Sequence, residues 1–312
     1  MNKKPDKFAK HHPKFTRQMT LREFDVLFPN EDACRTYLAQ HRWPKGVTCP
    51  RCKRPDNVYS LAKPWHWECS NPDCRSGNAY RFSLIAGTIY ENTKYPLLIW
   101  FKVLYMILTS KKGISALQVH RVIGTGSYST AFYMCHRLRA SLSDPEFRQL
   151  MGVVEVDETF IGGKEKNKHL GKRNPHNTGG VGKTIVIGAI ARKGNLVAQM
   201  IERADRDTMM RFVHEEVSRR VKLVVTDEHH GYDTLVDAGL AHDIVRHGDN
   251  EYVRGIVHTN TIEGFWSLLK RGIIGTYHNV SKKYLPLYLN EFTFRFNNRH
   301  NKDIFGSAIA GC

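Results

Sequence analysis

The sequence lacks an apolar run long enough to cross a membrane. Its most apolar stretch, residues 95–109, is interrupted by Lys102 and falls short of the about 20 residues that a spanning helix needs. Residues 1–17 are basic and polar, so the apolar segment of a secretory signal is missing as well. We therefore interpret residues 95–109 as a buried helix and expect a soluble, cytoplasmic protein with no membrane partner.

Acidic residues are also scarce. The 30 Asp and Glu residues stand against 47 Lys and Arg residues, which gives a formal net charge of +17. An excess of this size favours a polyanionic partner, and nucleic acid is the leading interpretation. The alternative is a basic enzyme whose charge serves only its solubility. Hydrophobic residues at 41% and aromatic residues at 11% exclude a disordered chain.

The seven cysteines do not suit a disulfide framework, because their number is odd and no export signal is visible. Four of them form two pairs, Cys49-x2-Cys52 and Cys69-x4-Cys74. Four thiolates make a closed tetrahedral shell, which predicts one structural Zn²⁺ ion without an open position for catalysis. Two chance pairs of free thiols are the alternative. We interpret the three remaining cysteines as free thiols.

The order of the sequence patterns predicts several regions. Thr20 and Glu23 match a capping box at the start of a helix, and Asn30 can cap a second helix after Pro29. The expected regions are a flexible basic arm at 1–17, N-terminal helices and a zinc ribbon at 18–90, a helical region at 91–150, an α/β domain at 151–300 and a C-terminal tail at 301–312.

The α/β domain is predicted from strands and helices that follow one another along residues 151–300. The turn at 192–195 joins two strand patterns into a hairpin. The full order is strand, strand, strand, helix, strand and helix, which is typical of an α/β fold with a mixed sheet. The corresponding ranges are 153–157, 184–191, 196–201, 207–221, 223–227 and 261–298.

Two short helices in the helical region suggest a DNA-reading helix-turn-helix. Residues 114–123 carry helical apolar spacing, Gly124 and Gly126 break the helix, and Ser127 can cap a second helix. The residues that would meet base edges stand at the start of the second helix. They are Tyr128, Ser129 and Thr130. A plain helical hairpin is the alternative.

The segment 164–183 is rich in cations and glycines and poor in apolar residues, which is typical of a loop that contacts DNA phosphates. The expected contacts are Lys164, Lys172, Arg173 and Lys183. The run Gly179 to Thr184 resembles a nucleotide-binding loop, but Asn177 occupies the position where that motif needs its first glycine. We therefore reject nucleotide binding.

A catalytic site is suggested by two aspartates at predicted strand ends, Asp157 and Asp227. Carboxylates that meet where two strands lie side by side can bind Mg²⁺ or Mn²⁺, and two such ions clamp the reacting oxygens of a phosphodiester. Farther on, Asn260, Glu263 and Lys270 share one helical face. The alternatives are strand-end turn caps for the aspartates and a surface ion pair for Glu263 with Lys270.

Together these residues resemble the DDE transposases. Three segments look like those of a group of bacterial insertion-sequence transposases: VDETFIGGK at 156–164, TDEHHGY at 226–232 and HTNTIEGFWSLLKR at 258–271. This group is related to the eukaryotic Merlin elements and carries an N-terminal zinc ribbon. The resemblance covers about residues 20–300. It implies an RNase H-like catalytic domain, two catalytic Mg²⁺ or Mn²⁺ ions, and double-stranded DNA as partner in a nucleoid-associated protein.

The resemblance also implies roles for single residues. Asp157, Asp227 and Glu263 would hold the metal ions, with Asn260 as the alternative third ligand. Lys270 would meet a phosphate, and the neighbouring Arg271 would contact DNA. The expected activity is strand cleavage and strand transfer at element ends, in a homodimer or a higher oligomer. A nuclease that only hydrolyses and a DNA-binding regulator with an inactive domain are the alternatives.

Overall fold

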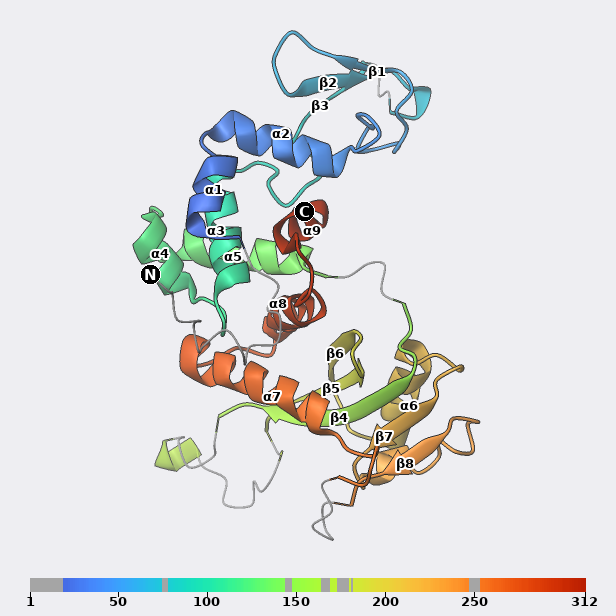
Figure 1. The fold of residues 1–312 in the computed structure, drawn as a ribbon. Helices are drawn as coiled ribbons and strands as arrows, with labels where there is room; N and C mark the ends of the chain where they lie inside the picture. The colour runs from blue at the N-terminus through green and yellow to red at the C-terminus, as the bar shows by residue number, and fades with distance from the viewer. Residues whose placement is uncertain are drawn as a thin grey trace, which may run out of the picture. The chain divides into compact units, whose positions relative to one another are not determined.

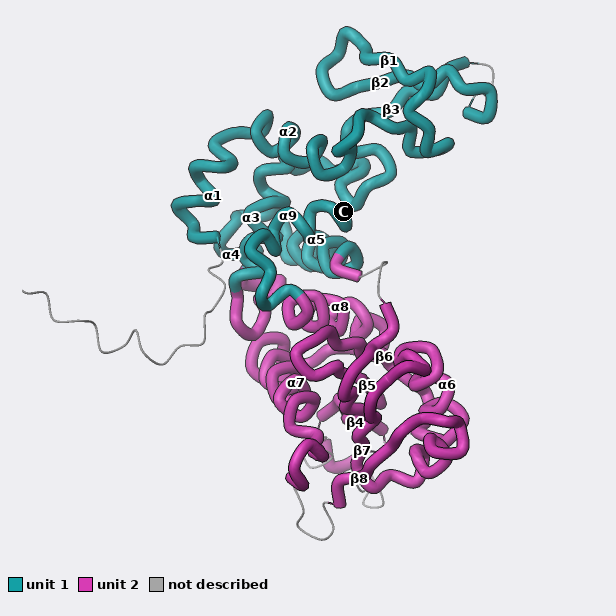
Figure 2. Tube along the Cα trace, turned by 45° about the vertical axis from the view of Figure 1, so that its right-hand side comes forward, with its two compact units in different colours: residues 1–109, 119–141, 298–312 teal, residues 110–118, 142–297 magenta. Residues whose placement is uncertain are grey.

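The structure is a computed structural model that describes residues 19–74, 78–143, 148–163, 169–172, 180, 182–246 and 253–312. The described residues fall into two compact units, coloured separately in Figure 2. The first comprises residues within 1–109, 119–141 and 298–312, and the second comprises residues within 110–118 and 142–297. The zinc-ribbon region, most of the helical region and the C-terminal residues therefore share one unit.

The first unit begins with two capped helices, α1 (Leu21–Leu27) and α2 (Glu31–Arg42). The Thr20 hydroxyl accepts the N–H of Glu23, and the Glu23 carboxylate accepts the N–H of Thr20, so the predicted capping box is confirmed. The Asn30 side chain caps α2 by accepting the N–H of Ala33 at 2.9 Å. These contacts satisfy N–H groups that a helix start leaves without partners.

A three-stranded antiparallel sheet follows α2. Its strands are β1 (Val58–Ser60), β2 (His66–Cys69) and β3 (Tyr80–Ser83), with β2 in the centre. A 3-10 turn, η2 (Pro72–Cys74), lies between β2 and β3. This small sheet carries few buried apolar residues, which is why it is expected to depend on a metal for its stability.

The remaining helices of the first unit surround α3 (Leu97–Thr109), which is the buried helix expected from its apolar run. Next come α4 (Ala116–Ile123), whose first three residues are assigned to the second unit, and α5 (Tyr128–Ser141). A turn at Gly124 separates them, and its positive φ of 73° suits glycine. The expected C-terminal tail is instead largely helix α9 (Ile304–Ala310). It forms because Phe305 is 3% exposed and packs against Phe28 and Phe101.

The second unit is built on a mixed sheet, as predicted, and this sheet has five strands (Figure 1). The strand order is β6-β5-β4-β7-β8, antiparallel across β6, β5 and β4 and parallel across β4, β7 and β8. The bounds are β4 (Val153–Ile161), β5 (Thr184–Ala191), β6 (Leu196–Ile201), β7 (Leu223–Thr226) and β8 (His242–Ile244). The sequence patterns did not indicate β8, whose three residues are all half-buried.

Helices cover both faces of this sheet. Helix α6 (Arg206–Glu216) ends short of the predicted Val221 and packs on one face, while α7 (Asn260–Gly272) and α8 (Leu285–Asn297) pack on the other. Alternate residues of β4 therefore face different helices. Val154 and Val156 join the α6 core, whereas Ile161 joins the α7 core. The short elements are η4 (Leu170–Lys172), η5 (His230–Tyr232) and the π-helix η7 (Ile273–Tyr277).

Strand β4 is longer than expected, and this changes the position of Asp157. The predicted strand ended at Asp157, but β4 continues to Ile161 because β5 pairs with it along Val154 to Ile161. Asp157 therefore lies in the middle of the strand, opposite Gly188. Asp227 does follow the last residue of β7, as predicted.

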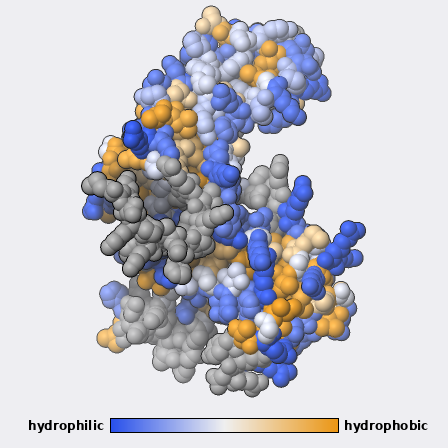
Figure 3. Space-filling view, viewed as in Figure 1, coloured by the Kyte–Doolittle hydropathy of each residue, from blue (hydrophilic) through white to orange (hydrophobic). Residues whose placement is uncertain are grey.

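Within the described residues, none of the helices is long and apolar enough to cross a membrane. The face drawn in Figure 3 is mainly hydrophilic, with hydrophobic side chains in scattered patches. This agrees with apolar residues that are gathered into buried clusters inside each unit.

Candidate catalytic site and zinc centre

Three carboxylates gather where β7 ends beside β4. Oxygens of Asp157, Glu158 and Asp227 all lie within 4.8 Å of one another, and all three residues are half-buried. The parallel register pairs Glu155 with Val225. Two residues farther along both strands are Asp157 and Asp227, so the register by itself brings these two aspartates to the same level.

Glu158 belongs to this group although it was not among the predicted site residues. Neighbours in a strand point to opposite faces, so Glu158 points away from the face that carries Asp157. Strand β7 stops at Thr226, however, and beyond that point no strand of the described residues pairs with β4 on that side. Both carboxylates can bend into this gap toward Asp227. The Tyr232 hydroxyl donates to Glu158 at 3.0 Å and holds it there.

Burial and nearby negative charge raise the proton affinity of two of these carboxylates, Asp157 and Glu158. Burial, then the Asp227 and Glu158 charges, raise the pKa of Asp157 to about 7. Burial and the Asp227 charge also raise the pKa of Glu158. Three carboxylates this close repel one another when ionised, and a divalent cation bound by their oxygens would offset that repulsion. The donor set and its spacing therefore fit such an ion.

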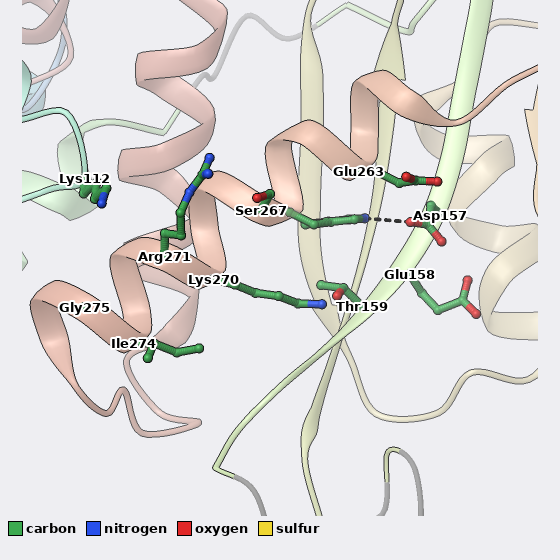
Figure 4. A pocket seen from close by; sticks show the side chains of 11 residues that line it. Lys112, Asp157, Glu158, Thr159, Glu263, Ser267, Lys270, Arg271, Ile274 and Gly275 are labelled. Atoms are coloured by element: carbon green, nitrogen blue, oxygen red, sulfur yellow. Dashed lines mark hydrogen bonds between the residues drawn. The ribbon is translucent and has the colours of Figure 1, made fainter. Parts of the chain in front are cut away.

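Helix α7 forms the other wall of an open groove of about 640 Å³ at these carboxylates (Figure 4). In the figure Lys270 extends from α7 toward β4, and Arg271 and Lys112 lie farther along. Acidic groups thus occupy one part of the groove and cations another. The groove is lined by Lys112, Asp157, Glu158, Thr159, Glu263, Trp266, Ser267, Lys270, Arg271, Ile274 and Gly275.

The two alternatives for the third ligand differ in their positions. Glu263 lines the groove, and its carboxylate accepts the hydroxyl of the buried Thr259 at 2.8 Å. Asn260 is exposed at the start of α7 and is not among the described residues that line the groove. Glu263 and Lys270 do face the same groove, as their helical spacing predicts.

Buried Glu155 connects β4 to the start of α7. Its carboxylate accepts the backbone N–H groups of Thr261 and Ile262 at 2.8 and 3.0 Å, the Thr261 hydroxyl at 2.8 Å and Nε of Arg192 at 2.7 Å. Thr259, the residue before α7, makes no side-chain cap. Glu155 therefore supplies the cap from a different element and aligns α7 with the strand that carries Asp157 and Glu158.

The four paired cysteines converge in the first unit. The Sγ atoms of Cys49 and Cys74 are 3.6 Å apart and those of Cys52 and Cys69 are 3.9 Å apart, and all four lie within 4.8 Å of one another. Four sulfurs placed tetrahedrally at about 2.3 Å from Zn²⁺ are about 3.8 Å apart. The side chain of Asn71 donates to the Cys52 sulfur. Both the donor set and its spacing therefore fit one structural zinc ion.

Comparisons with known proteins found matches to both regions of the chain. Residues 29–77 match a transposase zinc-ribbon domain and residues 149–297 match an ISXO2-like transposase domain, which together cover more than half of the chain. A protein in transposable element ISH50 of Halobacterium salinarum is 28% identical over 280 residues, which is 86% of this chain and 91% of that protein. The chain belongs to the ISXO2-like insertion-sequence transposases.

The transposase domain match includes the three carboxylates and all of α7, and the zinc-ribbon match includes all four cysteines. Membership of a transposase family indicates that DNA is the partner. The predicted DNA contacts are only partly described. Lys164 and Arg173 lie outside the described residues, as does the side chain of Lys172, while Lys183 is half-buried just before β5 and Arg271 lines the groove.

The predicted helix-turn-helix contacts stand at the start of α5. Ser127 caps the helix by accepting the N–H of Thr130 at 3.2 Å. Tyr128 is 49% exposed and Ser129 is exposed, whereas Thr130 is half-buried. Tyr133, one turn farther along, is 62% exposed and was not predicted. An aromatic residue in a helical apolar pattern normally suggests a core position, so this exposure was not visible in the sequence.

Proposed function

We propose that this chain is a DDE-type transposase that cleaves DNA at the ends of an insertion sequence and joins the freed ends to target DNA. The observation that carries the proposal is the carboxylate group of Asp157, Glu158 and Asp227. Asp157 and Glu158 line a groove together with the cations Lys112, Lys270 and Arg271. Acidic ligands for cations beside basic contacts for phosphates suit phosphodiester chemistry.

The carboxylates would hold two Mg²⁺ or Mn²⁺ ions, which when bound polarise the phosphate and activate the attacking oxygen. Asp157, Asp227 and Glu263 would hold these ions, and Glu158 would contribute a further carboxylate. Glu263 is preferred over Asn260 because it lines the groove and Thr259 orients its carboxylate. Asn260 remains the alternative that mutagenesis tests.

The proposed reaction has two steps, cleavage and joining. Water attacks a phosphodiester at the element end, which breaks one P–O bond and leaves a 3′-hydroxyl and a 5′-phosphate. The 3′-hydroxyl then attacks a target phosphodiester, forms a new P–O bond and releases a 3′-hydroxyl of the target. Lys270 and Arg271 would bind non-reacting phosphate oxygens and keep the strand along α7. Cleavage and joining thus use the same groove in turn.

The first unit would supply DNA recognition. We propose that the zinc ribbon and the start of α5, with exposed Tyr128 and Ser129, bind the element ends. The segment 164–183 would add contacts to phosphates that do not depend on sequence. Because two element ends must be held together for joining, we also propose a homodimer or a higher oligomer in the synaptic complex, acting at the nucleoid.

Strand joining is the decisive experiment. The purified chain is incubated with Mg²⁺, labelled copies of the terminal repeats that flank its gene, and a supercoiled target plasmid. We expect joined products from the unchanged chain and none from Asp157→Asn or Asp227→Asn, while binding to the labelled ends persists. Asp237→Asn, an exposed aspartate of the same unit, is the matched control and should join normally.

Other outcomes separate the alternatives. Cleavage without joining by the unchanged chain would identify a nuclease that only hydrolyses. Binding without cleavage would identify a regulator. For the third ligand, Glu263→Gln should abolish both steps and Asn260→Ala should cost less, whereas the opposite ranking would transfer the role to Asn260. Joining by Asp157→Asn would refute the metal-dependent mechanism at this site.

A further inference from the structure

A tryptophan from α7 contacts the central carboxylate of the site. Trp266 is 4% exposed, and its indole Nε1–H donates to Oδ2 of Asp157 at 2.9 Å, the hydrogen bond drawn as a dashed line in Figure 4. The apolar face of the ring belongs to the core between α7 and the sheet. The same side chain therefore packs the core and reaches the edge of the groove with its one polar atom.

The sheet has a gap that admits this ring. Gly188 of β5 lies directly opposite Asp157 in the β4–β5 register. A Cβ atom at Gly188 would lie 2.7 and 2.9 Å from two carbons of the Trp266 ring, closer than such atoms approach. Four of the other seven residues of β5 are Ile or Val, and a glycine inside such a strand weakens it. Its position is explained by the indole that lies over it and extends to Asp157.

The hydrogen bond constrains the carboxylate. A free aspartate can rotate its carboxyl group, and each of its two oxygens can accept hydrogen bonds or bind a cation. With the indole N–H on Oδ2, the rotation of the group is restricted, and each oxygen still has a lone pair that a cation could use. Groups that orient metal ligands in this way commonly alter metal affinity by about 10–100-fold when removed.

We propose that Trp266, admitted by Gly188, is a positioning residue that orients Asp157 toward a divalent cation. This inference deepens the proposed function and depends on it, because it assumes that Asp157 binds the cation. The alternative is that Trp266 only fills the core. These two roles differ in what they require of the side chain. Filling the core requires only the bicyclic ring, whereas orienting Asp157 requires the indole N–H group.

The experiment measures Mn²⁺ affinity of the full, zinc-loaded chain by electron paramagnetic resonance, without DNA. Trp266 is replaced by β-(3-benzothienyl)alanine, which keeps the bicyclic ring and substitutes sulfur for the N–H group. We expect Mn²⁺ affinity to fall about tenfold or more. The matched control is the same replacement at buried Trp100, whose N–H donates to Thr93 at 2.8 Å in the other unit, and it should leave Mn²⁺ affinity unchanged.

Further variants make the result decisive. Gly188→Ala should displace the ring and weaken Mn²⁺ binding in the same direction, and Trp266→Phe should do so by removing the donor. Unchanged Mn²⁺ affinity in folded benzothienylalanine protein would overturn the positioning role. Asp157→Asn is measured in parallel. If it also bound Mn²⁺ normally, the carboxylate group would not be the cation site, and the proposed function would fail independently of Trp266.

Discussion

The connection between β4 and α7 yields a prediction about stability. Glu155 lies on the same face of β4 as Asp157, where strand alternation alone would make it a further candidate metal ligand. In the structure its side chain is instead fully buried, and both of its oxygens are occupied by donors. We predict that Glu155→Gln mainly destabilises the second unit.

The size of the effect follows from the contacts. Oε1 accepts from Arg192 Nε and the Thr261 hydroxyl, and Oε2 accepts from the N–H groups of Thr261 and Ile262. A glutamine NH₂ group at the Oε2 position would face two backbone N–H donors, and at the Oε1 position it would face Arg192 Nε–H. Breaking a buried ion pair costs about 3–5 kcal/mol. In a unit of this size that lowers the melting temperature by about 6–20 °C.

Hydrogen exchange measured by mass spectrometry on peptides of β4 and β5 reports this unit separately from the first. Glu202→Gln, an exposed glutamate of the same unit, is the matched control and should change stability by less than about 0.5 kcal/mol. A loss below about 1 kcal/mol in Glu155→Gln would refute the argument, because the carboxylate would then not be what holds the start of α7.

Three further predictions concern metals, pH and DNA. Cys69→Ser should release the zinc ion and unfold the ribbon while the mixed sheet stays folded. Metal analysis and hydrogen exchange measure these two effects, and native protein that contains no zinc would contradict the prediction. Without a divalent cation, the unfolding free energy should fall as pH rises from about 4 to about 7, because the raised pKa of Asp157 makes the folded state hold the proton longer than the unfolded state. Asp157→Asn should flatten this dependence of the unfolding free energy on pH, as measured by urea titrations. An equally steep dependence in the variant would contradict the assignment to Asp157. DNA affinity should fall steeply with salt, and Tyr128→Ala should relax sequence preference in competition assays rather than weaken binding to all DNA alike.

Local sequence patterns were sufficient to predict a structural feature where that feature depends on one short segment of the chain. The cysteine spacing predicted a four-sulfur site, because each pair lies on one turn and the chemistry of four thiolates leaves few alternatives. Caps at Thr20 and Asn30 placed two helix starts, since those contacts span only three residues. The spacing of Glu263 and Lys270 likewise placed both on one face of α7, which lines the groove.

Tertiary structure decided what depends on neighbouring strands. Asp157 lies within β4 rather than at its end, because β5 pairs past it. Glu158 joins the carboxylates only because β7 stops beside β4, and alternation along a single strand would have directed it away. The bond from Trp266 to Asp157 needs a glycine in a third element. Sequence patterns thus determined the ligand types and most elements, while the register of the sheet determined which carboxylates meet.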